Sequence, residues 1–131
     1  MRLNQISIAC TDYAASVAFY RALGLRQIVD APPSYARFEC LSRSAEDEPP
    51  TLSLHTVEPG TQISTTMIYF EVEEVDATCK QLHDEAAIAF SAPQDQHWLW
   101  REAWAEDPAG NRVCIYHAGT NRRFPPWRVE G

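Results

Sequence analysis

The chain has 131 residues, enough for one domain with a substantial core. Its net charge of −7 disfavours nucleic acid and anionic membrane surfaces as partners, because both would repel it. No apolar run approaches the roughly 20 residues of a membrane span, and the first residues lack the long apolar stretch of a secretory signal. These features predict a cytoplasmic globular protein.

The first half of the chain predicts a strand, a helix and three more strands. Residues 3–10 alternate between apolar and polar or small side chains, as in a strand with one face on a core. Asp12 suits a helix N-cap, and Gly24 suits the position just after a helix end. The further strands are expected at 26–30, 35–41 and 51–57.

The same order of patterns begins again in the second half. Residues 67–72 alternate like the first strand, and apolar side chains recur at helical spacing over 75–86. The polar stretch 93–97 predicts a loop. Further strands are expected at 87–90, 98–106 and 112–117. The chain therefore predicts a βαβββ unit written twice, with Gln5 and Met67 at corresponding places.

Two motifs accompany this duplication: FYRALGL at the end of the first helix and the turn DPAGN at 107–111. Together with the doubled unit they resemble the vicinal-oxygen-chelate superfamily, which includes glyoxalase I, bleomycin-resistance proteins, fosfomycin-resistance enzymes and extradiol dioxygenases. The resemblance covers about residues 3–118. It implies a single α+β domain in which two tandem βαβββ modules, about 1–58 and 64–118, form an open cup-shaped mixed sheet with helices outside, followed by a C-terminal arm at about 119–131.

The resemblance also implies a divalent metal in the cup, held by His, Gln or Glu side chains from up to four strands. In this sequence the corresponding positions are occupied by Gln5, Ser53, Met67 and Cys114. This set contains no carboxylate and no imidazole, whereas a hard divalent cation prefers oxygen and nitrogen donors. We therefore expect no metal cofactor, although an atypical site made by His55 with Gln5 and Glu39 stays open.

Alternation along the strands predicts which side chains line the cup. The lining mixes aromatic, thioether and polar groups, which suits a small organic molecule held by a few fixed polar contacts. Glu39 and His55 are candidates for a general base in a metal-free reaction, and Glu71 is expected on the same face. The predicted ligand-binding residues are Gln5, Ser7, Glu39, Ser53, His55, Met67, Tyr69, Trp104, Cys114 and Tyr116.

Two further segments are unusual in composition. Trp98, Trp100 and Trp104 share one strand face with Glu102, while Arg101 lies on the other. Periodicity does not say which face looks inward, so stacking on a flat ligand and packing under a helix both stay open. The tail 121–128 is basic and aromatic, and it is expected to pack on its own chain or on a second subunit, or to close the cavity.

The four cysteines, Cys10, Cys40, Cys79 and Cys114, form no CxxC pair. We expect them to be free buried thiols rather than a disulfide framework or a zinc cluster.

Two functions are compatible with these residues. In the first, the chain is a metal-free protein of the bleomycin-resistance kind, a homodimer that binds a small organic molecule. In the second, it is a metal-dependent or metal-free lyase, isomerase or dioxygenase of the same superfamily. The residues at the ligand positions favour the first, while the identity of the ligand and whether any reaction is catalysed stay open.

Overall fold

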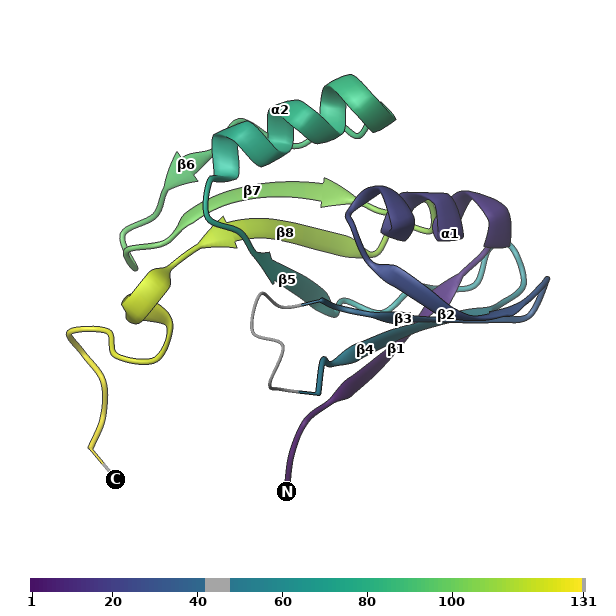
Figure 1. Ribbon diagram of the computed structural model, residues 1–131, viewed down its shortest axis with the longest axis horizontal. Coiled ribbons are helices and arrows are strands. Elements are labelled where there is room, and N and C mark those ends of the chain that lie inside the picture. The colour runs from purple at the N-terminus through teal and green to yellow at the C-terminus, as the bar shows by residue number, and fades with distance from the viewer. Residues whose placement is uncertain (42–47, 131) are drawn as a thin grey trace. The chain divides into compact units, whose positions relative to one another are not determined.

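The computed structural model describes residues 1–41 and 48–130. Contacts divide this part of the chain into two compact units. The first comprises Met1–Thr66 and Glu106–Asn111, and the second comprises Met67–Ala105 and the chain from Arg112 onward. Each unit contains one α-helix and an open four-stranded mixed sheet (Figure 1). This confirms the predicted α+β class and the doubled βαβββ unit.

The first unit places its helix between the first two strands of the chain. In chain order its elements are β1 (Gln5–Cys10), α1 (Tyr13–Ala22), β2 (Arg26–Ala31), β3 (Tyr35–Glu39) and β4 (Thr51–Thr56). The sheet order is β1-β4-β3-β2, with β1 parallel to β4 and the other neighbours antiparallel. The pairing of the first and fourth strands brings together side chains that are nearly fifty residues apart in sequence.

The ends of α1 follow from local chemistry. The Asp12 side chain accepts a hydrogen bond from the Ala15 amide at 3.0 Å, which satisfies one of the free donors of the first turn. After the last helical residue the chain turns at Gly24, whose φ of +93° is readily adopted only without a Cβ. Both predictions made for this helix are confirmed.

Strand alternation decides the core of the first unit. On the face of the sheet that carries α1, the side chains of Ile8, Phe38 and Leu54 are buried, and the Tyr20 ring of α1 lies 6.1 Å from that of Phe38. Residues one position away along each strand, such as Ser7 and His55, point to the opposite face. That opposite face is therefore polar.

The second unit repeats this arrangement. Its elements are β5 (Met67–Glu71), α2 (Val75–Ala86), β6 (Gln94–Asp95), β7 (Arg101–Glu106) and β8 (Arg112–His117), followed by a short 3₁₀ helix, η1 (Gly119–Arg122). The sheet order is β5-β8-β7-β6, with β5 parallel to β8. Ser7 pairs with Ser53 in the first sheet as Tyr69 pairs with Cys114 in the second, so Gln5 and Met67 do occupy corresponding positions.

Three predictions in this half are wrong. No strand forms at 87–90, because Ala87 adopts the left-handed conformation with φ of 54° that ends α2; the next strand is β6, inside the stretch predicted as a loop. The strand expected at 98–106 begins only at Arg101, because Leu99 also has a positive φ of 69° and its amide closes a turn on the Gln96 carbonyl.

The DPAGN turn between β7 and β8 belongs to the first unit. The Asp107 carboxylate accepts hydrogen bonds from the Tyr20 hydroxyl at 2.6 Å, from the amides of Ala109 and Asn111, and from the Asn111 side chain. That side chain also donates to the Ala9 carbonyl at 2.8 Å. The motif therefore holds the turn against α1 and β1 by hydrogen bonds, and the role of its residues is structural.

The cysteines match their prediction closely. Cys10, Cys79 and Cys114 are buried free thiols, and Cys40 is free and half-buried. Within residues 1–41 and 48–130, no helix is long and apolar enough to cross a membrane.

Candidate functional site

The predicted site residues lie on the sheet faces that point away from the helices. Five belong to the first unit, namely Gln5, Ser7, Glu39, Ser53 and His55. The other five belong to the second unit, namely Met67, Tyr69, Trp104, Cys114 and Tyr116. We call the first sheet face, with Tyr35, Arg37 and Thr51 added, the polar face. We call the second, with Trp98, Trp100, Glu102 and Arg112 added, the aromatic face.

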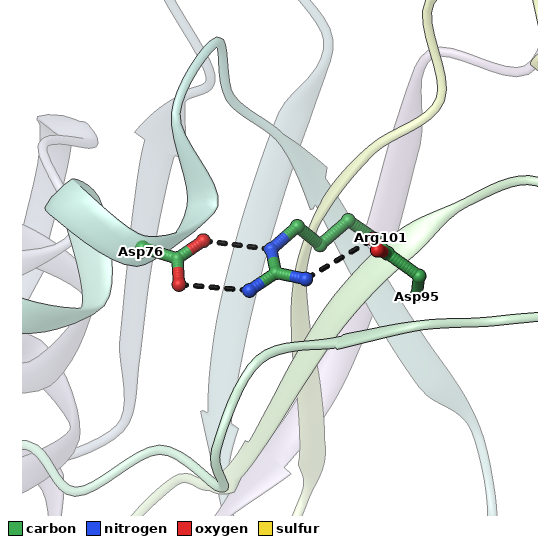
Figure 2. Close-up of polar contacts among 3 residues, drawn as sticks. All are labelled: Asp76, Asp95 and Arg101. Carbon is green, nitrogen blue, oxygen red and sulfur yellow. Dashed lines mark hydrogen bonds and ion pairs between the residues drawn. The ribbon is translucent and has the colours of Figure 1, made fainter.

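The contacts of one arginine, Arg101, show which face of β7 points toward α2. The Arg101 guanidinium donates from Nε and Nη2 to the two carboxylate oxygens of Asp76, at 2.7 and 2.8 Å, and from Nη1 to Asp95 at 3.1 Å (Figure 2). Asp76 lies in the first turn of α2, so the side chain of Arg101 is on the helix-bearing face. These bonds hold the pKa of the Asp76 carboxyl below its usual value.

By alternation, Trp100, Glu102 and Trp104 then point away from α2. Sequence periodicity did not show which face of this strand points inward. The contact between β7 and α2 shows it.

Four aromatic rings gather on the aromatic face around Tyr69. The centroid of the Tyr69 ring lies 6.0, 5.3 and 5.6 Å from those of Trp100, Trp104 and Tyr116. The plane of the Tyr69 ring is nearly perpendicular to all three. Trp100 also stacks on Tyr116, at 4.7 Å and an interplanar angle of 21°. The Tyr69 side chain remains 40% exposed, so the cluster presents ring surface outward.

A buried carboxylate lies beneath these rings. Glu102 is only 4% exposed, and its two oxygens accept hydrogen bonds from the indole N–H groups of Trp98 and Trp104, at 2.8 and 3.2 Å. Burial first, and then this negative charge, raise the pKa of the Tyr69 phenol. The same two causes raise the pKa of the Cys114 thiol to about 12. Glu102 therefore fixes two tryptophans and places a negative charge next to Tyr69 and Cys114.

Sequence reasoning placed Glu102 on the tryptophan face but assigned it no role. Its alternation with Trp100 and Trp104 was the only available signal. Arg112 was missed as well, and its guanidinium lies 4.8 Å from the centre of the Trp104 ring, a cation–π contact.

The polar face contains three side-chain pairs. The Ser7 Oγ and His55 Nδ1 atoms are 3.0 Å apart, the Thr51 hydroxyl donates to Gln5 Oε1 at 3.0 Å, and Arg37 Nε donates to the Tyr35 hydroxyl at 3.0 Å. The nearby Ser53 hydroxyl and then the Arg37 guanidinium hold the pKa of the Tyr35 phenol below its usual value. Tyr35 and Arg37 alternate with Glu39 along β3, a signal that would have identified them.

The residues at the family's ligand positions do not fit a hard divalent metal. Cys114 is fully buried and offers only a thiol, a soft donor that hard divalent cations disfavour. Met67 offers only a thioether, and the Gln5 carbonyl oxygen already accepts a hydrogen bond. In the described part of the chain, no three His, Cys, Asp or Glu side chains come together as a metal site would require.

The alternative set of His55 with Gln5 and Glu39 is also spread out. Gln5 and Glu39 both pair with Thr51, at the start of β4. His55 lies four residues further along that strand, about 13 Å away at the usual rise of a strand. This spacing is between backbone positions, and it is large for ligands of a single ion.

Some predicted features of the site have other roles. One Glu71 carboxylate oxygen accepts hydrogen bonds from the amides of Ala118 and Gly119, at 2.7 and 3.0 Å, where the chain leaves β8. In the tail, the Arg128 guanidinium lies 4.5 Å from the Phe124 ring centre, so the arm makes contacts within itself. Hollows in the surface next to β2 and next to α2 contain none of the ten predicted ligand-binding residues.

Comparison with known proteins now identifies the family. Residues 2–115 match the model of the glyoxalase/bleomycin resistance protein/dioxygenase superfamily. The chain belongs to this superfamily. Over 126 residues it is 32% identical to the uncharacterized protein YraH of Bacillus subtilis strain 168, covering 88% of this chain and 98% of the relative.

Solved structures of the superfamily share the fold. A glyoxalase/bleomycin resistance protein/dioxygenase from Nocardioides superposes with a TM-score of 0.72 at 20% identity, covering 99% of this chain and 90% of the other. Lactoylglutathione lyase from Agrobacterium tumefaciens superposes with a TM-score of 0.69 at 19% identity, covering 88% and 92%. At such identities these likenesses concern the fold alone.

Proposed function

We propose that this superfamily member is a binding protein that holds a flat, ring-containing organic molecule on its aromatic face. The observation that carries this proposal is the ring cluster around Tyr69, in which the Trp104 indole is fixed by a hydrogen bond to the Glu102 carboxylate. Aromatic side chains fixed in this way present a preorganised surface, so a ligand loses little by ordering them. A flat ring can then contact Tyr69 and the exposed parts of Trp100 and Trp104.

The electrostatics of the aromatic face further restrict the class of ligand that would bind there. The π-faces of tryptophan and tyrosine attract positive charge, and the Arg112 guanidinium above Trp104 shows such a contact within the protein. The Glu102 carboxylate adds a negative charge beside the rings, which offsets the positive charge of Arg112. We therefore propose an electron-poor or cationic ring system as the preferred ligand.

Fluorescence titration tests this proposal directly. The probe is N-methylquinolinium, a flat cation, and the comparison compound is cyclohexanecarboxylate, which is neither flat nor cationic. The probe is expected to quench tryptophan emission saturably, and Tyr69→Ala is expected to weaken its binding about tenfold, since loss of one stacking partner costs about 1–3 kcal/mol. The matched control is Trp127→Ala, which removes an exposed tail tryptophan. Equal affinity for Tyr69→Ala and wild type would refute the location.

We also propose that the protein acts without the family's metal. The support is the donor set at the ligand positions, in which a buried thiol and a thioether replace harder ligands. Titration of metal-free protein with nickel and zinc, followed by calorimetry, is expected to show no stoichiometric binding that depends on Gln5 or His55. One equivalent of tightly bound metal that is lost in Gln5→Ala would overturn this proposal.

A homodimer remains part of the proposal. The exposed Phe124 and Trp127 side chains and the arginines of the tail would complement an acidic surface on a second copy. Sedimentation velocity is expected to give a dimer that is weakened by Trp127→Ala and by raised salt. A monomer at all protein concentrations would refute it.

A further inference from the structure

The polar face carries a serine–histidine pair that binding on the aromatic face does not use. Ser7 lies in the middle of β1 and His55 near the end of β4, and the parallel pairing of these strands brings their side chains to one face. The Ser7 Oγ and His55 Nδ1 atoms are 3.0 Å apart, and both side chains are exposed. A hydroxyl within about 2.6–3.2 Å of an imidazole nitrogen is the arrangement of a nucleophile with its base.

The tautomer decides the direction of this bond. When neutral imidazole carries its proton on Nε2, its Nδ1 atom is an acceptor, and the Ser7 hydroxyl then donates to it. The imidazole is then placed to receive the hydroxyl proton as the oxygen attacks. No movement of the backbone is needed for this step.

The strand register places donors on one side of the pair. One row across the sheet contains Ser7, Ser53 and Arg37, and the next row contains His55 and Tyr35. Neighbouring strands are about 4.8 Å apart, so Arg37 and Tyr35 on β3 lie one strand beyond β4. Arg37 Nε donates to the Tyr35 hydroxyl at 3.0 Å, which joins the guanidinium and the phenol into one unit.

The charge on this unit suits an oxyanion. Arg37 carries a permanent positive charge, and its Nε atom lies 3.0 Å from the Tyr35 hydroxyl oxygen. Fixed donors of this kind stabilise the oxygen that becomes negative when an ester carbonyl is attacked.

We propose that Ser7 and His55 form a nucleophile–base pair that cleaves small esters, with Arg37 and Tyr35 stabilising the oxyanion. The Ser7 oxygen bonds to the carbonyl carbon while its proton passes to His55, and the carbonyl electron pair moves onto oxygen. When the carbonyl re-forms, the ester C–O bond breaks and His55 returns the proton to the leaving alcohol. Water, activated by His55, then hydrolyses the acyl-serine and releases the carboxylic acid.

Covalent labelling tests this proposal without a known substrate. Diethyl p-nitrophenyl phosphate reacts with an activated serine by the same attack, at phosphorus, with p-nitrophenolate as leaving group. Mass spectrometry of the full chain is expected to find one diethylphosphoryl group, on the peptide containing Ser7. Ser7→Ala and His55→Gln are both expected to lose the label. The matched control is Ser64→Ala, because the hydroxyl of this exposed serine contacts Thr66 and not a histidine.

Turnover of p-nitrophenyl acetate provides the second measurement. Loss of the label should be accompanied by loss of the acetyl-Ser7 intermediate, and Arg37→Met should slow acetylation by tenfold or more while leaving Ser7 as the labelled residue. Circular dichroism of each variant checks that the fold is retained. Absence of label from folded wild-type protein, or a label on Ser7 that persists in His55→Gln, would overturn the proposal.

Discussion

The hydrogen bond between Tyr20 and Asp107 provides a sharp test of how the DPAGN turn stabilises the protein. Tyr20 is fully buried and Asp107 is 4% exposed, and their oxygen atoms are 2.6 Å apart. Tyr20→Phe keeps the ring in contact with Phe19 and Phe38 but removes the donor to a buried carboxylate. A hydrogen bond to a charged group contributes about 1.5–3 kcal/mol, so the free energy of unfolding should fall by that amount.

Urea unfolding monitored by circular dichroism measures this loss. The matched control is Tyr13→Phe, which removes a hydroxyl bonded to the exposed carboxylate of Asp30 at 2.5 Å. Its effect should be smaller, because water replaces the lost partner at an exposed site. If Tyr20→Phe unfolds at the wild-type urea concentration with an unchanged slope, the buried network does not stabilise the turn.

The pH dependence of the same variant tests the electrostatic part of the reasoning. Burial first, and then the Asp107 charge, raise the pKa of Tyr20 above its ordinary value. The unfolded chain therefore loses this proton first, at about pH 10. The stabilisation is complete below that pH and declines above it, by about 1.4 kcal/mol for each pH unit. Tyr20→Phe should lack this decline, so an unchanged gap between variant and wild type from pH 8 to pH 11 would contradict the assignment.

The other predictions concern single groups in the second unit. Glu102→Gln should lower the free energy of unfolding by about 1–3 kcal/mol, because a carboxamide has one oxygen for two indole donors. The control is Glu106→Gln, because Glu106 is exposed. Equal urea midpoints for Glu102→Gln and wild type would contradict the role of Glu102. Ala87→Gly should stabilise the protein by up to about 1 kcal/mol because φ is 54° there. Ala86→Gly, at the last residue of the helix, should instead destabilise it, by at most about the same amount. A loss of stability in Ala87→Gly would refute the strain argument. Because burial raises the pKa of the Cys114 thiol to about 12, Cys114→Ser should leave unchanged the number of thiols that react rapidly with Ellman's reagent at pH 8; one fewer fast thiol would show that Cys114 is accessible.

Much of the fold could be predicted because it depends on local patterns. Alternation at Gln5–Cys10 and at Met67–Glu71 identified the paired strands of each unit, and the chemistry of Asp12 and Gly24 placed the ends of α1. The failures were local as well. Ala87 and Leu99 adopt positive φ angles without being glycine, so the residue types carried no warning of the turns that they make.

For the candidate site, the sequence and the tertiary structure supplied different information. Period-two alternation determined which residues share a face, and it grouped Glu102 with its tryptophans correctly. It does not determine which face carries the helix, since both faces of β7 contain charged and apolar residues. That choice was decided by Arg101, whose guanidinium must lie against Asp76 of α2, far from it in sequence.

Tertiary structure also decided the roles of two acidic residues. Asp107 opens the DPAGN motif and Glu102 alternates with tryptophans, but neither pattern shows that the carboxylate is buried or which donors it meets. Folding buries Asp107 among the donors of its own turn and Tyr20, and it buries Glu102 between two indole rings. The sequence by itself determined the family, the doubled unit and most members of each face. The roles of the buried charges depended on contacts between distant strands and helices, because only these contacts replace the water that each charge loses.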